Sequence, residues 1–283
     1  MKVVHTLAEL RDTLRAFESP AFVPTMGNLH AGHLALIDQA KPLGDVCVAS
    51  IFVNRLQFAP HEDFDSYPRT FENDCAQLQA HGCDVLFAPN EGELYPQAQT
   101  FKVSPDPGLD AILEGAFRPG FFQGVATVVM KLFQCVFGQA RGQGHAVFGQ
   151  KDYQQLMVIR HMVQQFAMPI TVHAGATVRA EDGLALSSRN GYLSADERAE
   201  AVHLSQALRY MITHAQSGER DWAALEAQAM ATLQARGWAP DYMTVRRQAD
   251  LQIPQDGDTE LVALGAAKLG PARLIDNWSF TLG

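Results

Sequence analysis

Long apolar runs, runs of basic residues and closely spaced cysteine pairs are all missing from this sequence of 283 residues. The longest mainly apolar stretch, VCVASIFV at residues 46–53, is too short for a membrane span, which needs about 20 residues. The opening MKVVHTLAELRD contains no apolar core of the length found in secretory signals. We therefore expect a cytoplasmic chain without a membrane partner.

The charge balance argues against nucleic acid as a partner. The net charge is −9, and nucleic-acid backbones are bound by clustered cations. A single nucleotide is not excluded, because a few local donors can hold its phosphates. The four cysteines form no C-x-x-C pair, which indicates reduced and mostly buried thiols.

The first 175 residues alternate between strand and helix patterns. Thr6 and Glu9 form a capping-box pair at the start of a helix. The continuous β-rich run at residues 46–54 is typical of a strand buried on both faces of a parallel sheet. The alternation predicts an α/β fold, a Rossmann-like parallel sheet with helices on both faces. The expected strands are 21–25, 46–54, 84–89, 145–149 and 170–175, and the expected helices are 6–17, 30–40, 70–80, 125–136 and 151–167.

The pattern changes near residue 178, where a second domain is expected. Ser194 and Glu197 form another capping-box pair, and Asp221 is placed to cap a second helix. Short β-rich pieces follow at residues 241–247, 261–269 and 272–280. We expect residues 1–178 to form the Rossmann-like domain and residues 179–283 a small α+β domain with two helices.

The stretch PTMGNLHAGH at residues 24–33 carries the strongest single motif. His30 and His33 are three residues apart, so on a helix they share one face. The N-terminus of that helix should present unpaired backbone N–H groups and a positive dipole end, which suit phosphate. Gly27 and Gly32 lack a Cβ, which should let a bulky ligand approach the backbone. The pattern resembles the HIGH-type signature of nucleotidyl-transferring enzymes, although a pair of surface histidines would look the same.

Two more polar clusters follow predicted strands. Asn54 and Gln57 carry amides that can read hydroxyl and carboxylate groups, with ordinary turn polarity as the alternative. Lys151 and Asp152 stand at a strand-to-helix junction, with Gln155 one turn later. A lysine there can neutralise a transferring phosphoryl group, while the simpler alternative is a solvated lysine beside a capping aspartate. Because parallel sheets bind ligands at the carboxyl ends of their strands, these clusters are expected to converge with PTMGNLH.

The stretch LALSSRNGYLS, which ends at Ser194, offers a third cluster. Ser187, Ser188 and Arg189 lie on a loop flanked by glycines. Such a loop can fold over a triphosphate, with the guanidinium reaching the leaving pyrophosphate. A polar surface turn is the alternative.

Six motifs, in order and spacing, closely resemble those of the pantoate–β-alanine ligase family: MGNLHAGH, FVNRLQF, SYPRT, LEGAFRPG, FGQKDYQQLMVIR and DGLALSSRNGYL. The resemblance implies an ATP-dependent ligase that condenses pantoate with β-alanine through a pantoyl-adenylate and releases AMP and pyrophosphate. It further implies a homodimer and Mg²⁺ bound to the phosphates of ATP and to water, without a metal site built from protein side chains. Residues 1–178 would bind nucleotide and pantoate, and residues 179–283 would form a lid.

The same resemblance implies roles for individual residues. His30, His33, Lys151 and Arg189 would offset the charge that develops on the phosphates, with His33 as proton donor. Gln57 would hold pantoate and also lie near β-alanine. Further pantoate contacts would come from Gln155, and weaker correspondences fall on Asn54, Tyr67 and Arg118. The full ATP-binding set would be Met26, Gly27, Asn28, Leu29, His30, Ala31, Gly32, His33, Gly149, Gln150, Lys151, Asp152, Val178, Leu186, Ser187, Ser188 and Arg189.

The chain departs from the family pattern at a few positions. Phe121 stands where the family often has histidine, which puts a polar role for this position in doubt. Gln150 replaces a usual glutamate, and Arg55 replaces a common proline. Residues 137–144 look longer than the usual connection and predict a surface turn. Since the proposed catalytic residues are unaffected, activity is expected to survive.

Two other functions compete with ligation. A cytidylyltransferase-type nucleotidyltransferase shares the HIGH-type signature but does not need two glutamines to read a small hydroxy acid. A non-catalytic nucleotide-binding module on the same fold would bind ATP without turnover. Release of AMP that depends on an amine would distinguish the ligase from both.

Overall fold

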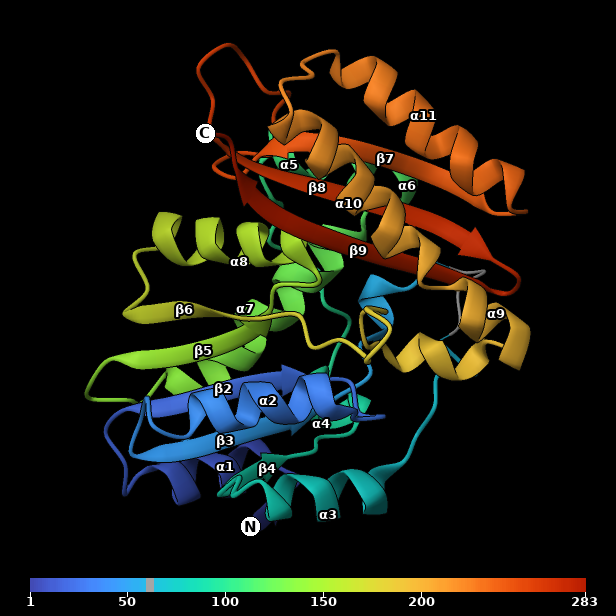
Figure 1. The fold of residues 1–283 in the computed structure, drawn as a ribbon. Coiled ribbons are helices and arrows are strands. Elements are labelled where there is room, and N and C mark those ends of the chain that lie inside the picture. The colour runs from blue at the N-terminus through green and yellow to red at the C-terminus, as the bar shows by residue number, and fades with distance from the viewer. Residues whose placement is uncertain (60–63) are drawn as a thin grey trace. The chain divides into compact units, whose positions relative to one another are not determined.

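The computed structural model describes residues 1–59 and 64–283 (Figure 1). The chain divides into two compact units. The first contains residues 1–150 and 155–176, and the second contains residues 151–154 and 177–283. Within the described residues, no helix is both long and apolar enough to cross a lipid bilayer.

A six-stranded sheet forms the centre of the first unit. Its strands are β1 (Lys2–Val4), β2 (Pro20–Thr25), β3 (Val46–Ile51), β4 (Val85–Phe87), β5 (Gly144–Gly149) and β6 (Ile170–Gly175). The strand order is β1-β4-β3-β2-β5-β6, and every neighbouring pair is parallel. This confirms the predicted Rossmann-like class. The sequence does not signal β1, because three residues are too few to show a period.

The helices of the first unit are α1 (Leu7–Leu14), α2 (Ala31–Ala40), α3 (Phe71–Ala80), α4 (Glu91–Leu94), α5 (Pro107–Asp110), α6 (Glu114–Phe117), α7 (Phe121–Phe137) and α8 (Tyr153–Gln165), with a 3₁₀ turn η1 (Arg55–Gln57). The Thr6–Glu9 capping box is present at the start of α1. Residues 138–143, between α7 and β5, form turns at the surface, as the sequence predicted. The short helices α4, α5 and α6 were not predicted.

Helices cover both faces of the parallel sheet. Phe22 of β2 packs edge-on against Phe133 and Phe137 of α7, with ring centroids 6.4 and 6.1 Å apart. Its neighbours Ala21 and Val23 belong instead to the apolar cluster that contains the buried side chains of α2. Because side chains alternate along a strand, α7 and α2 must cover opposite faces.

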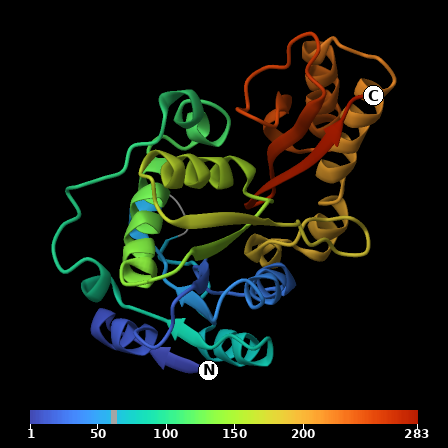
Figure 2. The ribbon, with the colours of Figure 1, turned by 90° about the vertical axis from the view of Figure 1, so that its left-hand side faces the viewer.

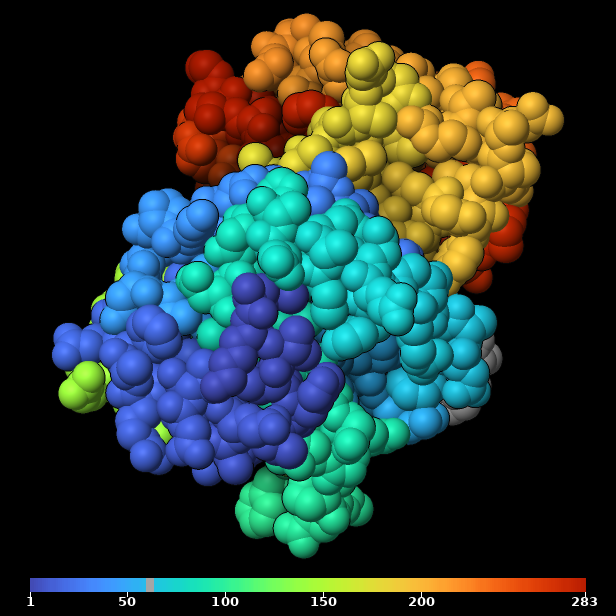
Figure 3. Space-filling model, turned by 90° about the horizontal axis from the view of Figure 1, so that it is seen from below, coloured from blue at the N-terminus to red at the C-terminus, as the bar shows by residue number. Residues whose placement is uncertain are grey.

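The segment at residues 95–106, between α4 and α5, contains neither helix nor strand and runs along α7 (Figure 2). The backbone N–H of Val103 donates to the hydroxyl of Thr127 on α7 at 3.0 Å. On another face of this unit, the N-terminal residues lie beside the α3–α4 region (Figure 3). There the backbone N–H of Leu7 donates to the carboxylate of Glu93 at 2.8 Å. The first bond holds the irregular segment against α7, and the second joins the start of α1 to α4.

The second unit is a three-stranded antiparallel sheet covered by helices. Its order is β7-β8-β9, and its elements are η2 (Ser188–Tyr192), α9 (Ala195–Glu200), α10 (His203–Gln216), α11 (Trp222–Ala235), β7 (Ala239–Arg247), β8 (Glu260–Leu269) and β9 (Ala272–Thr281). The cap by Asp221 and the Ser194–Glu197 capping box are both present. Two helices were expected here and three are found, because α9 stops at Glu200 and α10 begins anew at His203.

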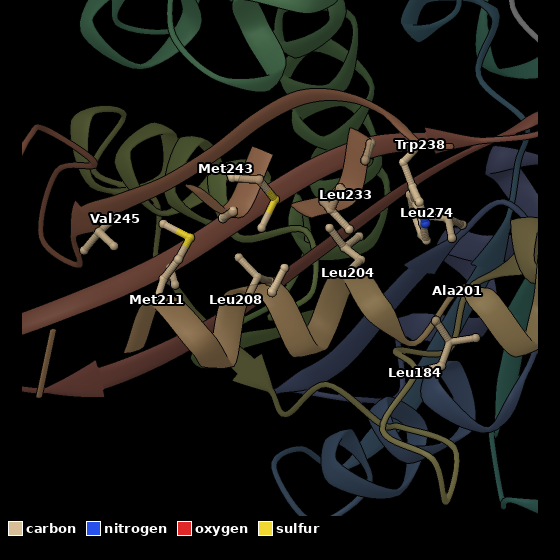
Figure 4. Packing of buried hydrophobic residues seen from close by; sticks show 14 of the residues in the cluster. Leu184, Ala201, Leu204, Leu208, Met211, Leu233, Trp238, Met243, Val245 and Leu274 are labelled. Atoms are coloured by element: carbon tan, nitrogen blue, oxygen red, sulfur yellow. The ribbon is translucent and has the colours of Figure 1, made fainter. Parts of the chain in front are cut away.

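The core of the second unit lies between α10, α11 and the sheet (Figure 4). Leu208 and Met211 of α10 are fully buried and point toward Met243 and Val245 of β7. Gly265 of β8 permits this packing, since a Cβ there would lie 2.5 Å from the sulfur of Met243. A Cβ there would also lie 3.2 Å from Leu204 of α10, so the side chains of both β7 and α10 use the space at this glycine.

Arg179 fastens the loop at residues 177–187 to β9. Its guanidinium donates to both carboxylate oxygens of Asp276, at 2.8 and 2.9 Å. The same guanidinium carbon lies 3.8 Å from the ring centroid of Trp278. Since Asp276 is only 4% exposed, this bidentate pair replaces hydration that the carboxylate has lost.

Glu200 gives the second unit a pH-dependent stability. It accepts hydrogen bonds from Arg236 at 2.7 and 2.8 Å and from the indole of Trp238 at 3.0 Å. The Arg236 guanidinium, aided by Trp238, lowers the pKa of Glu200 from 4.5 to about 2. A lowered pKa stabilises the fold above pH 4.5, and this contribution is lost as the pH falls toward 2.

We therefore predict that Glu200→Gln lowers the free energy of unfolding by about 1 kcal/mol at neutral pH. The difference from the unchanged protein should shrink steadily below pH 4.5 and disappear near pH 2. Urea unfolding followed by tryptophan fluorescence measures it, with Glu181→Gln, an exposed glutamate, as control. A difference that does not vary with pH would contradict this role of the Glu200 charge.

Candidate active site

The loops after β2, β3 and β5 leave the parallel sheet at one edge. β2 lies between β3 and β5, and all three strands run in the same direction, so their carboxyl ends meet. From β2 the strands that follow in sequence, β3 and β4, are added on one side of the sheet, and β5 and β6 are added on the other side. A reversal of this kind is where open α/β sheets bind ligands. The loops that start here are residues 26–30, 52–57 and the chain at Gln150.

His30 and His33 cap the N-terminus of α2. His30 is the N-cap residue, and its Nδ1 accepts the backbone N–H of Gly32 at 3.1 Å. The Nδ1 of His33 accepts the backbone N–H of His30 at 3.3 Å, and the two ring centroids are 4.1 Å apart. The expectation of unpaired N–H groups at this helix end is therefore wrong for these two groups, because the histidines themselves are their acceptors.

These caps determine where the imidazole protons lie. A ring nitrogen that accepts a hydrogen bond carries no proton, so a neutral ring in this arrangement is protonated on Nε2. Nε2–H is a donor of the kind that phosphate oxygens accept. The Nδ1 atoms of both rings thus face the end of α2, and the Nε2 atoms lie on the opposite side of each ring.

Gly27 leaves no room for a side chain. A Cβ there would lie 3.1 Å from the Asp74 carboxylate and 3.1 Å from the Ile51 side chain. Protein atoms therefore occupy the direction in which a side chain would point, and the approach of a ligand to this backbone stays a prediction. The sequence does not signal Asp74, because its backbone partners Asn28 and Leu29 lie 46 and 45 residues away.

Gln57 is oriented by a buried network. Asn54, 1% exposed, donates to the side-chain oxygen of Gln57 and to the carbonyl of Gly124, both at 3.2 Å. The hydroxyl of Tyr95 donates to Asn54 at 3.0 Å, and burial raises the pKa of Tyr95, which keeps that proton in place. The Gln57 amide nitrogen lies 3.2 Å from the sulfur of Met26. Asn54 thus fixes its neighbour, and Tyr95 is a contributor that the sequence did not signal.

A pocket of about 320 Å³ opens beside Gln57. Lys102 and Arg118 both line it, so it suits a carboxylate or another anion. Arg118 donates to the backbone carbonyl of Gln57 at 3.4 Å, and its guanidinium carbon lies 3.7 Å from the ring centroid of Phe121. Phe121 therefore stacks on a cation where the family often has histidine. Tyr67, by contrast, is buried, with its ring 6.1 Å from that of Phe58.

The predicted site residues divide between the two units. The first unit holds residues 26–33, Gln57, Gly149, Gln150 and Gln155, and the second holds Lys151, Asp152, Val178, Leu186, Ser187, Ser188 and Arg189. Gln150 donates its backbone N–H to the carbonyl of Gly175 at 2.8 Å, which continues the β5–β6 pairing past the strand end. Gln155 is half-buried on α8.

Within the second unit, the structure brings Lys151 next to the serine-rich loop. Lys151 and Ser187 line the same narrow pocket, and Asn277 donates to the Lys151 carbonyl at 2.7 Å. The Leu186 backbone N–H donates to the Val178 carbonyl at 3.0 Å, so these two predicted residues are direct neighbours. Lys151 and Ser187 are distant in sequence, whereas Val178 and Leu186 belong to one loop.

The hydroxyl of Ser187 begins the 3₁₀ turn η2 by accepting the backbone N–H of Arg189 at 3.3 Å. Across residues 1–59 and 64–283, no group of three or more His, Cys, Asp or Glu side chains is arranged to hold a metal ion.

A profile described as pantoate–β-alanine ligase matches residues 2–279. The chain belongs to the pantoate–β-alanine ligase family. Two curated members named pantothenate synthetase, from Paracidovorax citrulli and Leptothrix cholodnii, are 64% and 60% identical to it. These alignments cover 99% and 98% of this chain and 100% and 99% of theirs. The family resemblance inferred from the six motifs is thereby confirmed.

Solved structures of ligases in this family share the fold. Thermus thermophilus pantothenate synthetase has a TM-score of 0.91 and 45% identity, with 98% of this chain and 99% of that chain covered. Francisella tularensis pantoate–β-alanine ligase, complexed with "Beta-gamma ATP" and β-alanine, has a TM-score of 0.82 and 31% identity over 98% and 97% of the two chains. The pairing of a parallel and an antiparallel sheet is thus the fold of this ligase family.

We predict that Asn54→Ala destabilises this ligase by about 1–3 kcal/mol, because it leaves buried groups of Tyr95 and Gly124 without their partner. Gln57→Ala is the matched control. Gln57 is only half-buried, and its removal preserves both of those bonds, so its cost should stay below about 1 kcal/mol. Urea unfolding at neutral pH compares the two variants. Equal losses would contradict the structural role of Asn54.

Proposed function

We propose that this chain joins pantoate to β-alanine in two steps, with ATP consumed as a substrate. The pantoate carboxylate first attacks the α-phosphorus of ATP, which forms pantoyl-adenylate and releases pyrophosphate. The β-alanine amine then attacks the acyl carbon, and AMP leaves. Activation is required because a carboxylate oxygen is a poor leaving group. The observation that carries this proposal is the ligase family match over residues 2–279.

The two histidines are proposed to bind the ATP phosphates. Their Nδ1 atoms accept backbone N–H groups, so each ring would donate from Nε2 to a phosphoryl oxygen. Donors fixed before the reaction stabilise charge that develops on the phosphates without having to reorganise. His33 would be the proton donor of the pair. The ring separation of 4.1 Å between His30 and His33 supports a shared phosphate target.

Cationic side chains would complete the phosphate site. Lys151 and Arg189 are proposed to offset the negative charge on the departing pyrophosphate. The other proposed ATP contacts are residues 26–33, Gly149, Gln150, Asp152, Val178 and Leu186–Ser188. Mg²⁺ would neutralise further charge on the phosphates, with phosphate and water oxygens as its ligands.

The acid and the amine are proposed to bind around Gln57. Gln57 and Gln155 would read the hydroxyl and carboxylate groups of pantoate through their amides. β-Alanine would lie near Gln57, with its carboxylate toward the pocket lined by Arg118 and Lys102. Two cations in a pocket of about 320 Å³ support this assignment for a small amino acid. We also propose a homodimer that acts in the cytoplasm, which sedimentation velocity and cell fractionation can examine.

The decisive assay is exchange of labelled pyrophosphate into ATP, with pantoate and Mg²⁺ present and β-alanine absent. We expect exchange that depends on pantoate, followed by release of AMP once β-alanine is added. His33→Ala should lower the exchange rate by at least about 100-fold. His33→Asn is the matched variant, since its side-chain oxygen can replace Nδ1 as acceptor while Nε2 is lost. Folded enzyme without exchange would contradict the adenylate route, and near-normal exchange in His33→Asn would remove Nε2 from the chemistry.

Gln57→Ala should raise the KM for pantoate by about 10-fold or more and change the KM for ATP far less. The reason is that a half-buried amide that would read the acid is lost while the phosphate donors stay in place. Steady-state kinetics with each substrate varied in turn measures the split. Equal changes in the two KM values would place the Gln57 side chain outside the pantoate site.

A further inference from the structure

Asp74 is an acidic side chain enclosed within the first unit. It lies in the first turn of α3 and is 1% exposed. A carboxylate in such a place loses most of its hydration, which only strong hydrogen bonds can replace. None of the roles proposed above for ATP, pantoate or β-alanine uses this group. Its hydrogen-bond partners therefore indicate what it contributes.

The carboxylate holds the loop between β2 and α2. One oxygen accepts the backbone N–H of Asn28 at 2.9 Å, and the other accepts that of Leu29 at 2.9 Å. The hydroxyl of Thr70 lies 3.1 Å from each oxygen. A carboxylate has two equivalent acceptor oxygens, so it can bind two consecutive N–H groups at once.

The loop adopts a conformation that favours glycine. Gly27 has φ +80° and Asn28 has φ +52°, so two consecutive residues are left-handed. Such angles are uncommon for non-glycine residues, although asparagine adopts them more readily than most. A Cβ at Gly27 would also lie 3.1 Å from the Asp74 oxygen, so the loop closes directly over the carboxylate. Asp74 is therefore the group that the loop is folded around.

The same loop determines where the two histidines begin. His30 follows Leu29 directly and is the N-cap residue of α2, and its ring packs against that of His33. A rotation of the chain at Asn28 or Leu29 would redirect both imidazoles. Because Asp74 already occupies the N–H groups of these two residues, they do not compete with the histidines for phosphate.

We propose that Asp74 is a positioning residue for ATP activation. By holding the N–H groups of Asn28 and Leu29, it sets the direction in which His30 and His33 meet the phosphates. This role rests on the proposed function of the two histidines. A displacement of a catalytic group by about 1 Å can lower a rate by about 100-fold, so Asp74 has a large effect on rate without touching substrate.

The test compares Asp74→Asn with Glu72→Gln. Both changes remove one negative charge from the first turn of α3, but Glu72 is exposed. Asparagine would set an NH2 group against one of the two backbone N–H groups. We expect Asp74→Asn to lower kcat for pyrophosphate exchange by about 10- to 100-fold, with the KM for pantoate within about twofold. Glu72→Gln should match the unchanged enzyme.

A milder variant keeps the test valid if Asp74→Asn fails to fold. Thr70→Val removes the hydroxyl that donates to Asp74, and Thr70 makes no side-chain cap bond to α3, so the helix keeps its start. We expect kcat to fall by about 3- to 10-fold, again with little change in the KM for pantoate. Circular dichroism and thermal unfolding establish that each variant is folded.

Coupling to His33 separates positioning from general stability. If Asp74 acts through the histidines, Asp74→Asn in a His33→Ala background should lower the residual exchange by less than about threefold. Two results would overturn the role of Asp74 and leave the proposed function intact. One is that the losses in exchange rate from the two substitutions are additive. The other is that folded Asp74→Asn enzyme has the same kcat as Glu72→Gln. Absence of exchange in the unchanged enzyme would overturn the proposed function and this inference with it.

Discussion

Parallel pairing of β2 along both of its edges is the constraint on which the first unit depends. With β3 on one side and β5 on the other, three strands deliver their carboxyl ends to one edge of the sheet. Parallel strands need crossover connections, and the helices in these connections cover the sheet. α2 packs on one face and α7 on the other. The resulting frame is covered on both faces, and the loops at residues 26–30 and 52–57 start from its central strands.

Buried polar groups then turn these loops into a defined site. Asn54 fixes Gln57, Asp74 fixes the backbone at Asn28, and the His30 ring fixes the end of α2. Leaving a buried donor or acceptor without a partner costs more free energy than one hydrogen bond contributes. Each network therefore has essentially one favourable arrangement. Loops without regular structure can therefore hold side chains in constant directions.

Departures from the family pattern follow the same logic. Phe121 replaces a common histidine and can no longer offer a polar atom, yet its ring stacks on the Arg118 guanidinium at 3.7 Å. The Arg118 guanidinium thus has an aromatic partner, and Arg118 lines the pocket beside Gln57. In the second unit, the guanidinium of Arg179 is held in a similar way by Asp276 and the ring of Trp278. Both units thus use an aromatic face to orient a guanidinium.

The sequence by itself determined the fold class, five of the six parallel strands, the capped helix starts and the family, because these depend on local periodicity and on motifs that are contiguous in the chain. It also indicated His30, His33 and Gln57, which lie inside such motifs. Only the tertiary structure decided that the histidines cap α2 through Nδ1 and that Asp74 and Tyr95 support the site. Tyr95 reaches Asn54 across 41 residues, and Asp74 reaches Leu29 across 45. Contacts of this range leave no local pattern, because burial and hydrogen-bond direction exist only once distant segments have packed together.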